Sequence, residues 1–161
     1  MIVKTEHLPL PVVFLGLAIA LILNLIPLRS ELAFWRPPLV LLVVVYCVIR
    51  EPRRFGLVFA WCTGLIQDLM LGGILCQHAT AMAAACYLVV SQEHRLHHFN
   101  ILYQCLFVAV VVFVYQTIFL AIRLVSEDLD IFLPLFYSVF TGALVWPLLY
   151  SSMLKLQGQH W

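Results

Sequence analysis

Long apolar runs recur along the whole chain, and this recurrence limits its fold more than any other feature. The runs approach the roughly 20 residues that an α-helix needs to cross a hydrocarbon layer of about 30 Å. Of the 161 residues, 64% are hydrophobic and 11% are charged, whereas an ordinary globular domain has about 45–50% apolar and about 25% charged residues. The sequence therefore predicts one all-helical membrane domain over residues 1–161.

Charged and turn-forming residues divide this domain into about six predicted transmembrane helices. The second helix is compact and follows the segment Phe34-Trp35-Arg36-Pro37, whose aromatic and cationic side chains are typical of the membrane–water interface. A Gly72-Gly73 turn without charge predicts a tight hairpin between the third and fourth helices. The predicted spans are residues 9–28, 38–49, 55–71, 75–90, 101–122 and 131–154.

Lysines and arginines on the short connections predict the orientation, because cationic segments resist translocation. An inside N-terminus places six of these residues on the cytoplasmic side and three on the outer side. The inner set is Lys4, Arg50, Arg53, Arg54, Arg95 and Lys155, and the outer set is Arg29, Arg36 and Arg123. We therefore expect both termini to be cytoplasmic.

Asp68 is the one carboxylate within a predicted span. An ionisable group there costs several kcal/mol unless it is paired or protonated, so it is a candidate functional residue. Gly64, Asp68 and Gly72 recur every four residues and share one helix face, where small residues let another helix approach closely. We favour a structural anchor over an ion or substrate site.

The partner of Asp68 is left open by the sequence. Counting along its helix places the carboxylate toward the outer side of the membrane. Three residues predicted on that side could keep it ionised, namely Arg36, Arg123 and His78. Nearby, residues 79–85 form a small-residue stretch that invites another helix, from the same chain or from a partner. Its candidate contact residues are Ala79, Ala83 and Ala84.

No motif in the chain predicts catalysis, a metal or a cofactor. Ser-His-Asp, H-E-x-x-H, phosphate-loop and paired-carboxylate patterns do not occur. His94, His97 and His98 cluster in a short solvated stretch that offers little support for a metal, and the five cysteines form no C-x-x-C pair. A net charge of +1 without a basic stripe argues against a nucleic-acid partner.

Three motifs resemble the rod shape-determining protein MreD family of bacteria, and the resemblance covers nearly the whole chain. They are Phe34-Trp35-Arg36-Pro37-Pro38-Leu39-Val40-Leu41-Leu42, Gly64-Leu65-Ile66-Gln67-Asp68 with Gly72, and Trp146-Pro147 after Gly142. One departure is Cys76, where the family usually has glycine. By this resemblance, we expect the residues that position helices or partners to be Arg36, Pro37, Gly64, Asp68, Gly72, Trp146 and Pro147.

The resemblance implies a non-enzymatic inner-membrane subunit of the machinery that builds the lateral peptidoglycan wall. Its implied partners are the lipid bilayer and MreC, a single-span protein with a periplasmic coiled coil. Through MreC or directly, it would meet the actin-like MreB, the glycosyltransferase RodA and a class B penicillin-binding transpeptidase. The resemblance also implies the six-helix fold of the substrate-binding subunits of energy-coupling-factor transporters, although a shared fold does not transfer function.

A small-molecule-binding transport component is the alternative interpretation. Polar residues near the outer end, including Asp68, Gln77 and His78, would then line a pocket. Such a pocket needs several convergent polar groups and an enclosed cavity. The sequence shows few such groups, which favours the assembly subunit.

Overall fold

The computed structural model describes residues 8–26, 35–72, 75–92, 100–126 and 133–156, which form six α-helices and no strand. This confirms the predicted all-helical bundle, and the helix ends differ from the predicted ones by at most four residues. The helices are α1 Leu10–Leu25, α3 Leu39–Arg50, α4 Leu57–Leu71, α5 Gln77–Ser91, α7 Ile101–Ser126 and α8 Leu133–Leu156.

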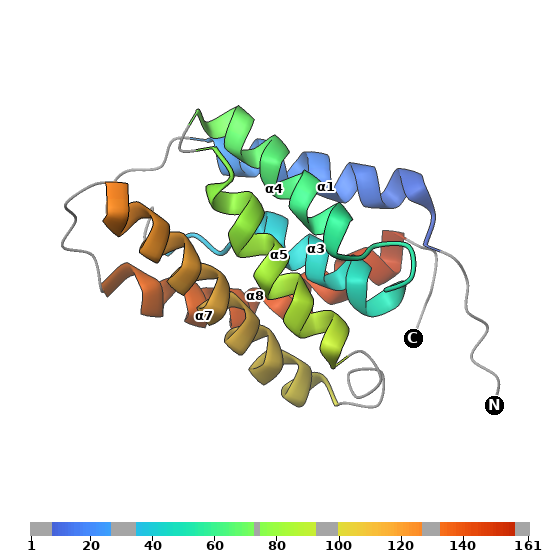
Figure 1. The fold of residues 1–161 in the computed structure, drawn as a ribbon. Helices are drawn as coiled ribbons and strands as arrows, with labels where there is room; N and C mark the ends of the chain where they lie inside the picture. Colours follow the sequence, from blue (N-terminus) through green and yellow to red (C-terminus); the bar gives the residue numbers. More distant parts are fainter. Residues whose placement is uncertain (1–7, 27–34, 73–74, 93–99, 127–132, 157–161) are drawn as a thin grey trace.

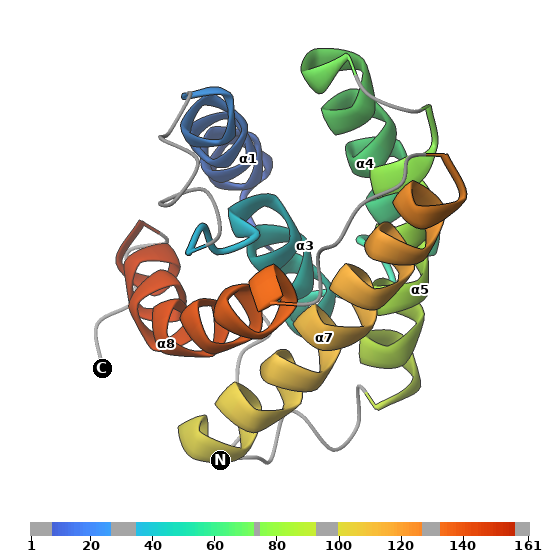
Figure 2. The same cartoon turned by 90° about the vertical axis from the view of Figure 1, so that its left-hand side faces the viewer.

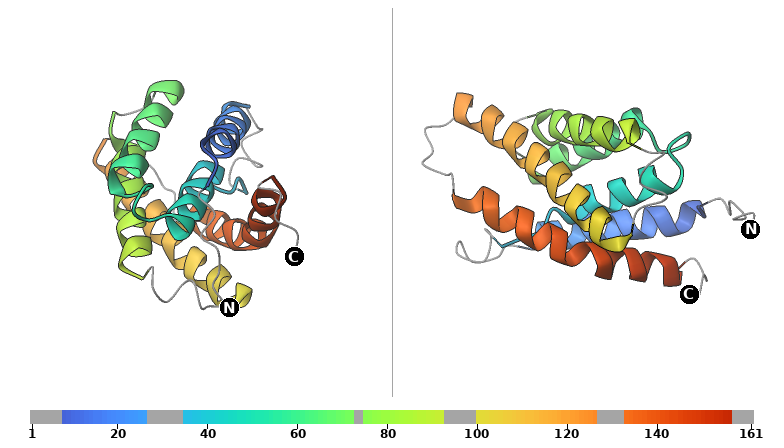
Figure 3. Two further views of the ribbon diagram at one scale, coloured as in Figure 1. Left: turned by 90° about the vertical axis from the view of Figure 1, so that its right-hand side faces the viewer. Right: turned by 90° about the horizontal axis from the view of Figure 1, so that it is seen from below.

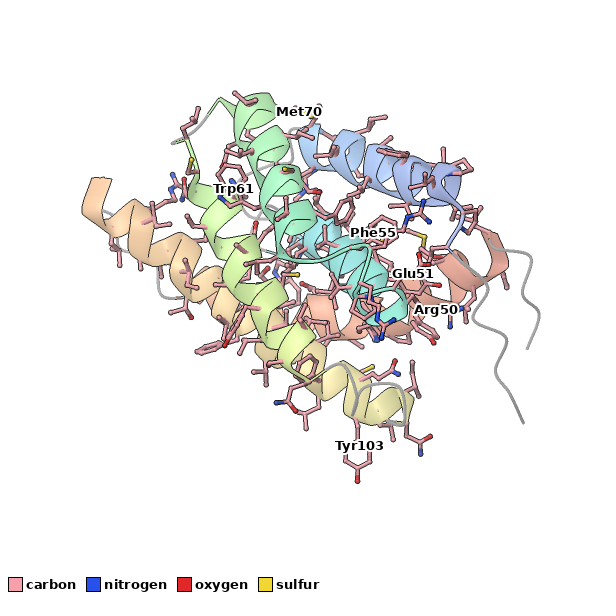
Figure 4. All side chains as sticks on the ribbon, turned by 45° about the vertical axis from the view of Figure 1, so that its right-hand side comes forward. Arg50, Glu51, Phe55, Trp61, Met70 and Tyr103 are labelled. Carbon is pink, nitrogen blue, oxygen red and sulfur yellow. The ribbon has the colours of Figure 1, made fainter. Side chains whose placement is uncertain are left out.

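Successive helices alternate in direction along the bundle (Figures 1 and 3). Helices α1, α4 and α7 finish at the end where α3, α5 and α8 begin. The short connection between α3 and α4, with Arg50, Glu51 and Phe55, lies at the opposite end (Figure 4). The bundle therefore has two distinct ends, which differ in the residues they gather.

Helix α3 is the centre of the bundle. Every residue from Val40 to Ile49 is buried, and Figure 2 shows the other helices arranged around α3. Its sequence is apolar on all sides, which is the pattern of a helix enclosed by others. Twelve residues span only about 18 Å, less than a hydrocarbon layer, and such a short helix is tolerated at membrane depth because surrounding protein shelters its ends.

The outer surface of the bundle is rich in large apolar side chains. Exposed examples occur on every side, including Phe14, Val58, Leu102 and Leu148, and Trp61, Met70 and Tyr103 project from the ribbon in Figure 4. Segments Ile101–Leu124 and Tyr137–Leu156 are long and apolar enough to cross a membrane, while α1, α3 and α4 are shorter apolar helices. The chain is thus a helical membrane protein whose exterior suits lipid or partner helices.

Because α3 is central, a valine-to-alanine substitution should lower the free energy of unfolding more in α3 than on the exposed face of α4. Val44→Ala removes fully buried packing and should lower the free energy of unfolding by about 1–2 kcal/mol. Val58→Ala, on an α4 side chain that is 76% exposed, should change it by less than about 0.5 kcal/mol. Thermal unfolding in detergent, followed by size-exclusion chromatography, measures both; equal losses would contradict a buried central helix.

Candidate functional site

The Asp68 carboxylate caps the start of helix α5. It lies in the last turn of α4 and is only 1% exposed. Its Oδ1 accepts the backbone N–H of His78 at 2.9 Å, and its Oδ2 accepts that of Ala79 at 3.3 Å. First-turn N–H groups have no partner within their own helix, and the N-cap residue Cys76 supplies no side-chain cap. Asp68 therefore acts as the N-cap of α5, although it belongs to the neighbouring helix α4. The dipole of α5 also favours a negative charge at this position.

The His78 side chain adds a third contact to the same carboxylate. Its Nδ1 lies 2.7 Å from Asp68 Oδ1. Of the three candidate partners, the structure places His78 against the carboxylate. The Arg123 guanidinium instead lies over the Phe119 ring, 5.9 Å from its centroid, and that ring is 4.7 Å from the His78 ring. The guanidinium of Arg36 donates to the carbonyl of Leu23 at the end of α1.

Gly64 allows α5 to come close enough for this capping. A Cβ atom at Gly64 would lie 2.7 Å from the backbone nitrogen of Ala79 and 2.9 Å from the carbonyl carbon of His78. Both separations are shorter than ordinary Cβ contacts, and the obstructing atoms are backbone atoms that cannot rotate away. The residue at this position must therefore lack a side chain. Ala79 is fully buried here, so it faces α4 rather than a partner helix.

Gly72 ends α4 and starts the turn toward α5. Its φ of 64° is in the left-handed region, and its N–H donates to the carbonyl of Asp68 at 3.1 Å. This is the usual way for a glycine to terminate a helix. The three residues spaced four apart thus have different roles: Gly64 lets α5 approach α4, Asp68 caps α5, and Gly72 ends α4.

Cys76 adopts a left-handed conformation at the other side of this turn, with φ 69°. A residue with a side chain pays about 1–2 kcal/mol in this region, whereas glycine does not. The position therefore favours glycine on backbone grounds. The cost of Cys76 is thus backbone strain.

The segment before α3 is fastened by three other helices. The guanidinium of Arg36 donates a hydrogen bond to the backbone carbonyl of Leu23 in α1. The backbone carbonyl of Arg36 accepts a hydrogen bond from the hydroxyl of Ser138 in α8, at 3.3 Å. The Ser138 oxygen in turn accepts Nε2 of Gln116 from α7 at 2.6 Å. Ser138 had no signal in the sequence, because one serine in an apolar helix can serve many roles. The predicted Arg36 position is therefore a junction of helix ends.

Aromatic rings and the adjoining prolines complete this junction. The Trp35 and Tyr137 rings pack with their centroids 4.7 Å apart. Pro37 and Pro38 follow Arg36 in the sequence and directly precede α3. A Cβ atom at Gly142 would lie 3.2 Å from Val112 and 3.8 Å from Pro38, so this glycine lets α7 and the start of α3 approach α8.

Trp146 and Pro147 lie further along α8 and belong to a different cluster. Trp146 is fully buried and packs against Tyr150, which contacts Tyr46 of the central helix. Pro147 lies inside α8 and is exposed. Its ring cannot donate the helix hydrogen bond of that turn. The structure therefore separates this motif from Asp68 and Arg36.

A cavity of about 220 Å³ lies among the helix ends that Asp68 and Arg36 fix. Its floor is the first turn of α3, and its walls come from α1, α4, α5 and α7. Gln67 lines it, is 5% exposed and has no hydrogen-bond partner for its Oε1 among the described residues. The polar lining residues are Asn24, Arg36, Gln67, His78, Tyr115 and Gln116.

A second hollow lies near the other half of α5. It is an apolar groove of about 490 Å³ lined by Ala83 and Ala84 together with Leu57, Tyr87, Leu88 and Val114. Ala83 and Ala84 are half-buried, so part of the predicted small-residue surface stays accessible. Within the described ranges, no group of three or more His, Cys, Asp or Glu residues could hold a metal ion.

Comparison with known families matches residues 5–156 to the family described as rod shape-determining protein MreD. The chain belongs to the MreD family. One similar protein, the rod shape-determining protein MreD of Haemophilus influenzae, is 24% identical over 139 residues, which cover 86% of each chain. No solved structure matches the chain, so the expected likeness to energy-coupling-factor subunits stays a prediction.

The contact at Gly64 predicts a strong effect of one added methyl group in this MreD-family protein. Gly64→Ala should force α4 and α5 apart and lower the free energy of unfolding by about 2–3 kcal/mol. Gly56→Ala is the matched control, because its Cβ would meet only the Pro52 carbonyl oxygen at an ordinary 3.6 Å. Thermal unfolding in detergent compares the two, and tolerance of Gly64→Ala would contradict the close approach.

The capping geometry predicts that Asp68 matters more than its histidine partner. Asp68→Ala leaves two buried N–H groups without acceptors and should cost about 2–4 kcal/mol. His78→Phe keeps both backbone hydrogen bonds and should cost only about 1 kcal/mol. The same unfolding measurement decides between helix capping and a side-chain ion pair as the main role; equal losses would favour the ion pair.

The strain at residue 76 predicts that glycine stabilises the chain. Cys76→Gly should raise the free energy of unfolding by about 0.5–1 kcal/mol, since relief of the left-handed conformation exceeds the entropic cost of glycine. Cys76→Ala removes the thiol but keeps the Cβ atom, so it should leave the midpoint temperature nearly unchanged. A gain with alanine equal to that with glycine would assign the effect to the thiol instead.

Proposed function

We propose that this protein is a non-enzymatic subunit of the bacterial cell-elongation complex, which helps MreC and the associated peptidoglycan synthases to maintain rod shape. The observation that carries this proposal is the use of its polar residues inside the bundle. The oxygens of Asp68 hold the start of α5, and Arg36, Ser138 and Gln116 join helix ends. The exposed helix surface is rich in large apolar side chains, which suits assembly within a membrane.

The groove at Ala83 and Ala84 is the proposed docking place for the single membrane helix of MreC. Helices associate in lipid mainly by close packing, and small residues let two backbones approach. The groove combines two alanines with the exposed aromatic side chain of Tyr87. MreB, RodA and a class B penicillin-binding transpeptidase would be reached directly or through MreC.

The proposed location is the inner membrane, with both termini in the cytoplasm. Arg50, Arg53, Arg54 and Lys155 belong to the bundle end that would face the cytoplasm, in keeping with the preference of cationic loops for that side. The end that holds Arg36, Asp68 and the small cavity would face outward.

The cavity is the observation that favours the alternative of a small-molecule transport component. Its volume of about 220 Å³ is smaller than the roughly 300–1,000 Å³ of most ligand pockets. A vitamin-sized cargo would not be enclosed by it. The assembly role therefore agrees better with the size of the site.

A substitution that fills the groove tests the docking proposal. Ala84→Phe should reduce copurification with MreC at least about tenfold and cause loss of rod shape, because the bulky ring prevents helix approach. Ala121→Phe, at an exposed alanine of α7 outside the groove, is the control and should preserve both. Membrane levels of the two variants are compared by immunoblot.

Two results would count against the proposal. Normal MreC recovery with Ala84→Phe would move the docking surface elsewhere. Purification of the wild-type protein in mild detergent with a bound small molecule and a transport energising subunit, without MreC, would favour the transport alternative.

A further inference from the structure

The cavity at the outer end has an unpaired hydrogen-bond acceptor deep inside it. Gln67 is 95% buried, and its Oε1 has no partner among the described residues. A buried polar atom left in this state costs about 1–3 kcal/mol. The cost disappears if the cavity holds a group that donates a hydrogen bond, so Gln67 points to a ligand with an N–H or O–H group.

A cation lines the same cavity. The guanidinium of Arg36 has five N–H donors in a fork that fits phosphate, and its bond to the Leu23 carbonyl uses one of them. Among the residues that the structure describes, no acidic side chain lines the cavity, and the Asp68 carboxylate is directed to the amides of α5. The site therefore favours a ligand that carries an anionic group for Arg36 and, next to it, a hydrogen-bond donor for Gln67 Oε1.

The surroundings of the cavity indicate where such a ligand comes from. Trp35 and Tyr137 are adjacent in sequence to Arg36 and Ser138, are both partly exposed and pack together. Paired aromatic rings of this kind occupy the headgroup level of a membrane. Leu23 and Leu71, at the helix ends that flank the cavity, are each 42% exposed. A polar hollow at headgroup level, bordered by apolar helix surface, matches a molecule with a polar head and acyl chains.

We propose that this cavity binds the headgroup of a phospholipid, with the phosphate at Arg36 and a headgroup ammonium or hydroxyl group donating to Gln67 Oε1. The volume of about 220 Å³ equals roughly seven water molecules, which suits a group the size of phosphoethanolamine. The lipid thereby satisfies the buried oxygen of Gln67 and fills the space between the ends of α1 and α4 and the part of α7 from Tyr115 to Phe119.

Competition between two zwitterionic lipids tests this proposal. The full-length protein is purified in detergent, offered equal amounts of phosphatidylethanolamine and phosphatidylcholine, and examined by native mass spectrometry. Choline headgroups have no N–H or O–H donor, so the ethanolamine lipid should be retained roughly two- to tenfold better, the worth of one hydrogen bond. Both lipids carry the same net charge, which isolates the donor.

The variants separate binding from packing. Gln67→Met keeps the side-chain length and should abolish the preference for the ethanolamine lipid, whereas a purely structural role would leave the ratio unchanged. Gln104→Met is the control and should keep the preference, because this buried glutamine of α7 lies about 16 Å along the helix from the cavity residue Tyr115. Arg36→Gln should weaken both lipids roughly tenfold by removing the charged contact with phosphate.

Three outcomes would overturn the proposal. The wild-type protein could retain the two lipids equally, or Gln67→Met could retain the wild-type ratio. A photocrosslinking residue at Leu71 could also capture a protein segment in place of lipid in native membranes, which would assign the cavity to a polypeptide.

Discussion

The contact between the Asp68 carboxylate and the first amides of α5 is the interaction on which the rest of the bundle depends. A buried carboxylate and unpaired N–H groups are each costly at membrane depth, and placing them together gives each a hydrogen-bond partner. The contact requires two backbones at very short separation, which Gly64 permits, and a reversal of the chain just beyond Asp68, which Gly72 begins. Capping, close approach and turn are therefore one arrangement.

Because this arrangement fixes α5 on α4, it also fixes where α5 meets its other neighbours. Helix α5 packs against α3 and α7, and Gln77 at its start donates to the Phe119 carbonyl of α7 at 3.2 Å. On the opposite side of the cavity, Ser138 links α8 to the backbone of Arg36. These side-chain hydrogen bonds between different helices thus gather at the helix ends, whereas the exposed helix faces are rich in large apolar side chains.

Much of this fold could be predicted from sequence, because the length of an apolar run and the breaks between runs are local properties. The spacing of Gly64, Asp68 and Gly72 was likewise visible, since residues four apart share a helix face. The two backbone N–H groups that donate hydrogen bonds to Asp68 could not be predicted, because a cap supplied by another helix depends on the distance between the two helices. The same reason hid the burial of Ala79 and the junction at Ser138. At residue 76, the sequence showed only a cysteine where the resemblance implied glycine. The left-handed backbone conformation of this residue became visible only in the structure.

The short central helix explains why a cavity forms where it does. Helix α3 spans about 18 Å, whereas the 26 residues of α7 span about 39 Å. Helix α7 is thus about twice as long as α3, and its residues Tyr115, Gln116 and Phe119 line the space above the first turn of α3. The lining comes from the end of α1, the start of α3, the last turns of α4, the start of α5 and the interior of α7. Arg36, Gln67 and Gln116 enter that space, so the polar site lies where the enclosed 12-residue helix begins.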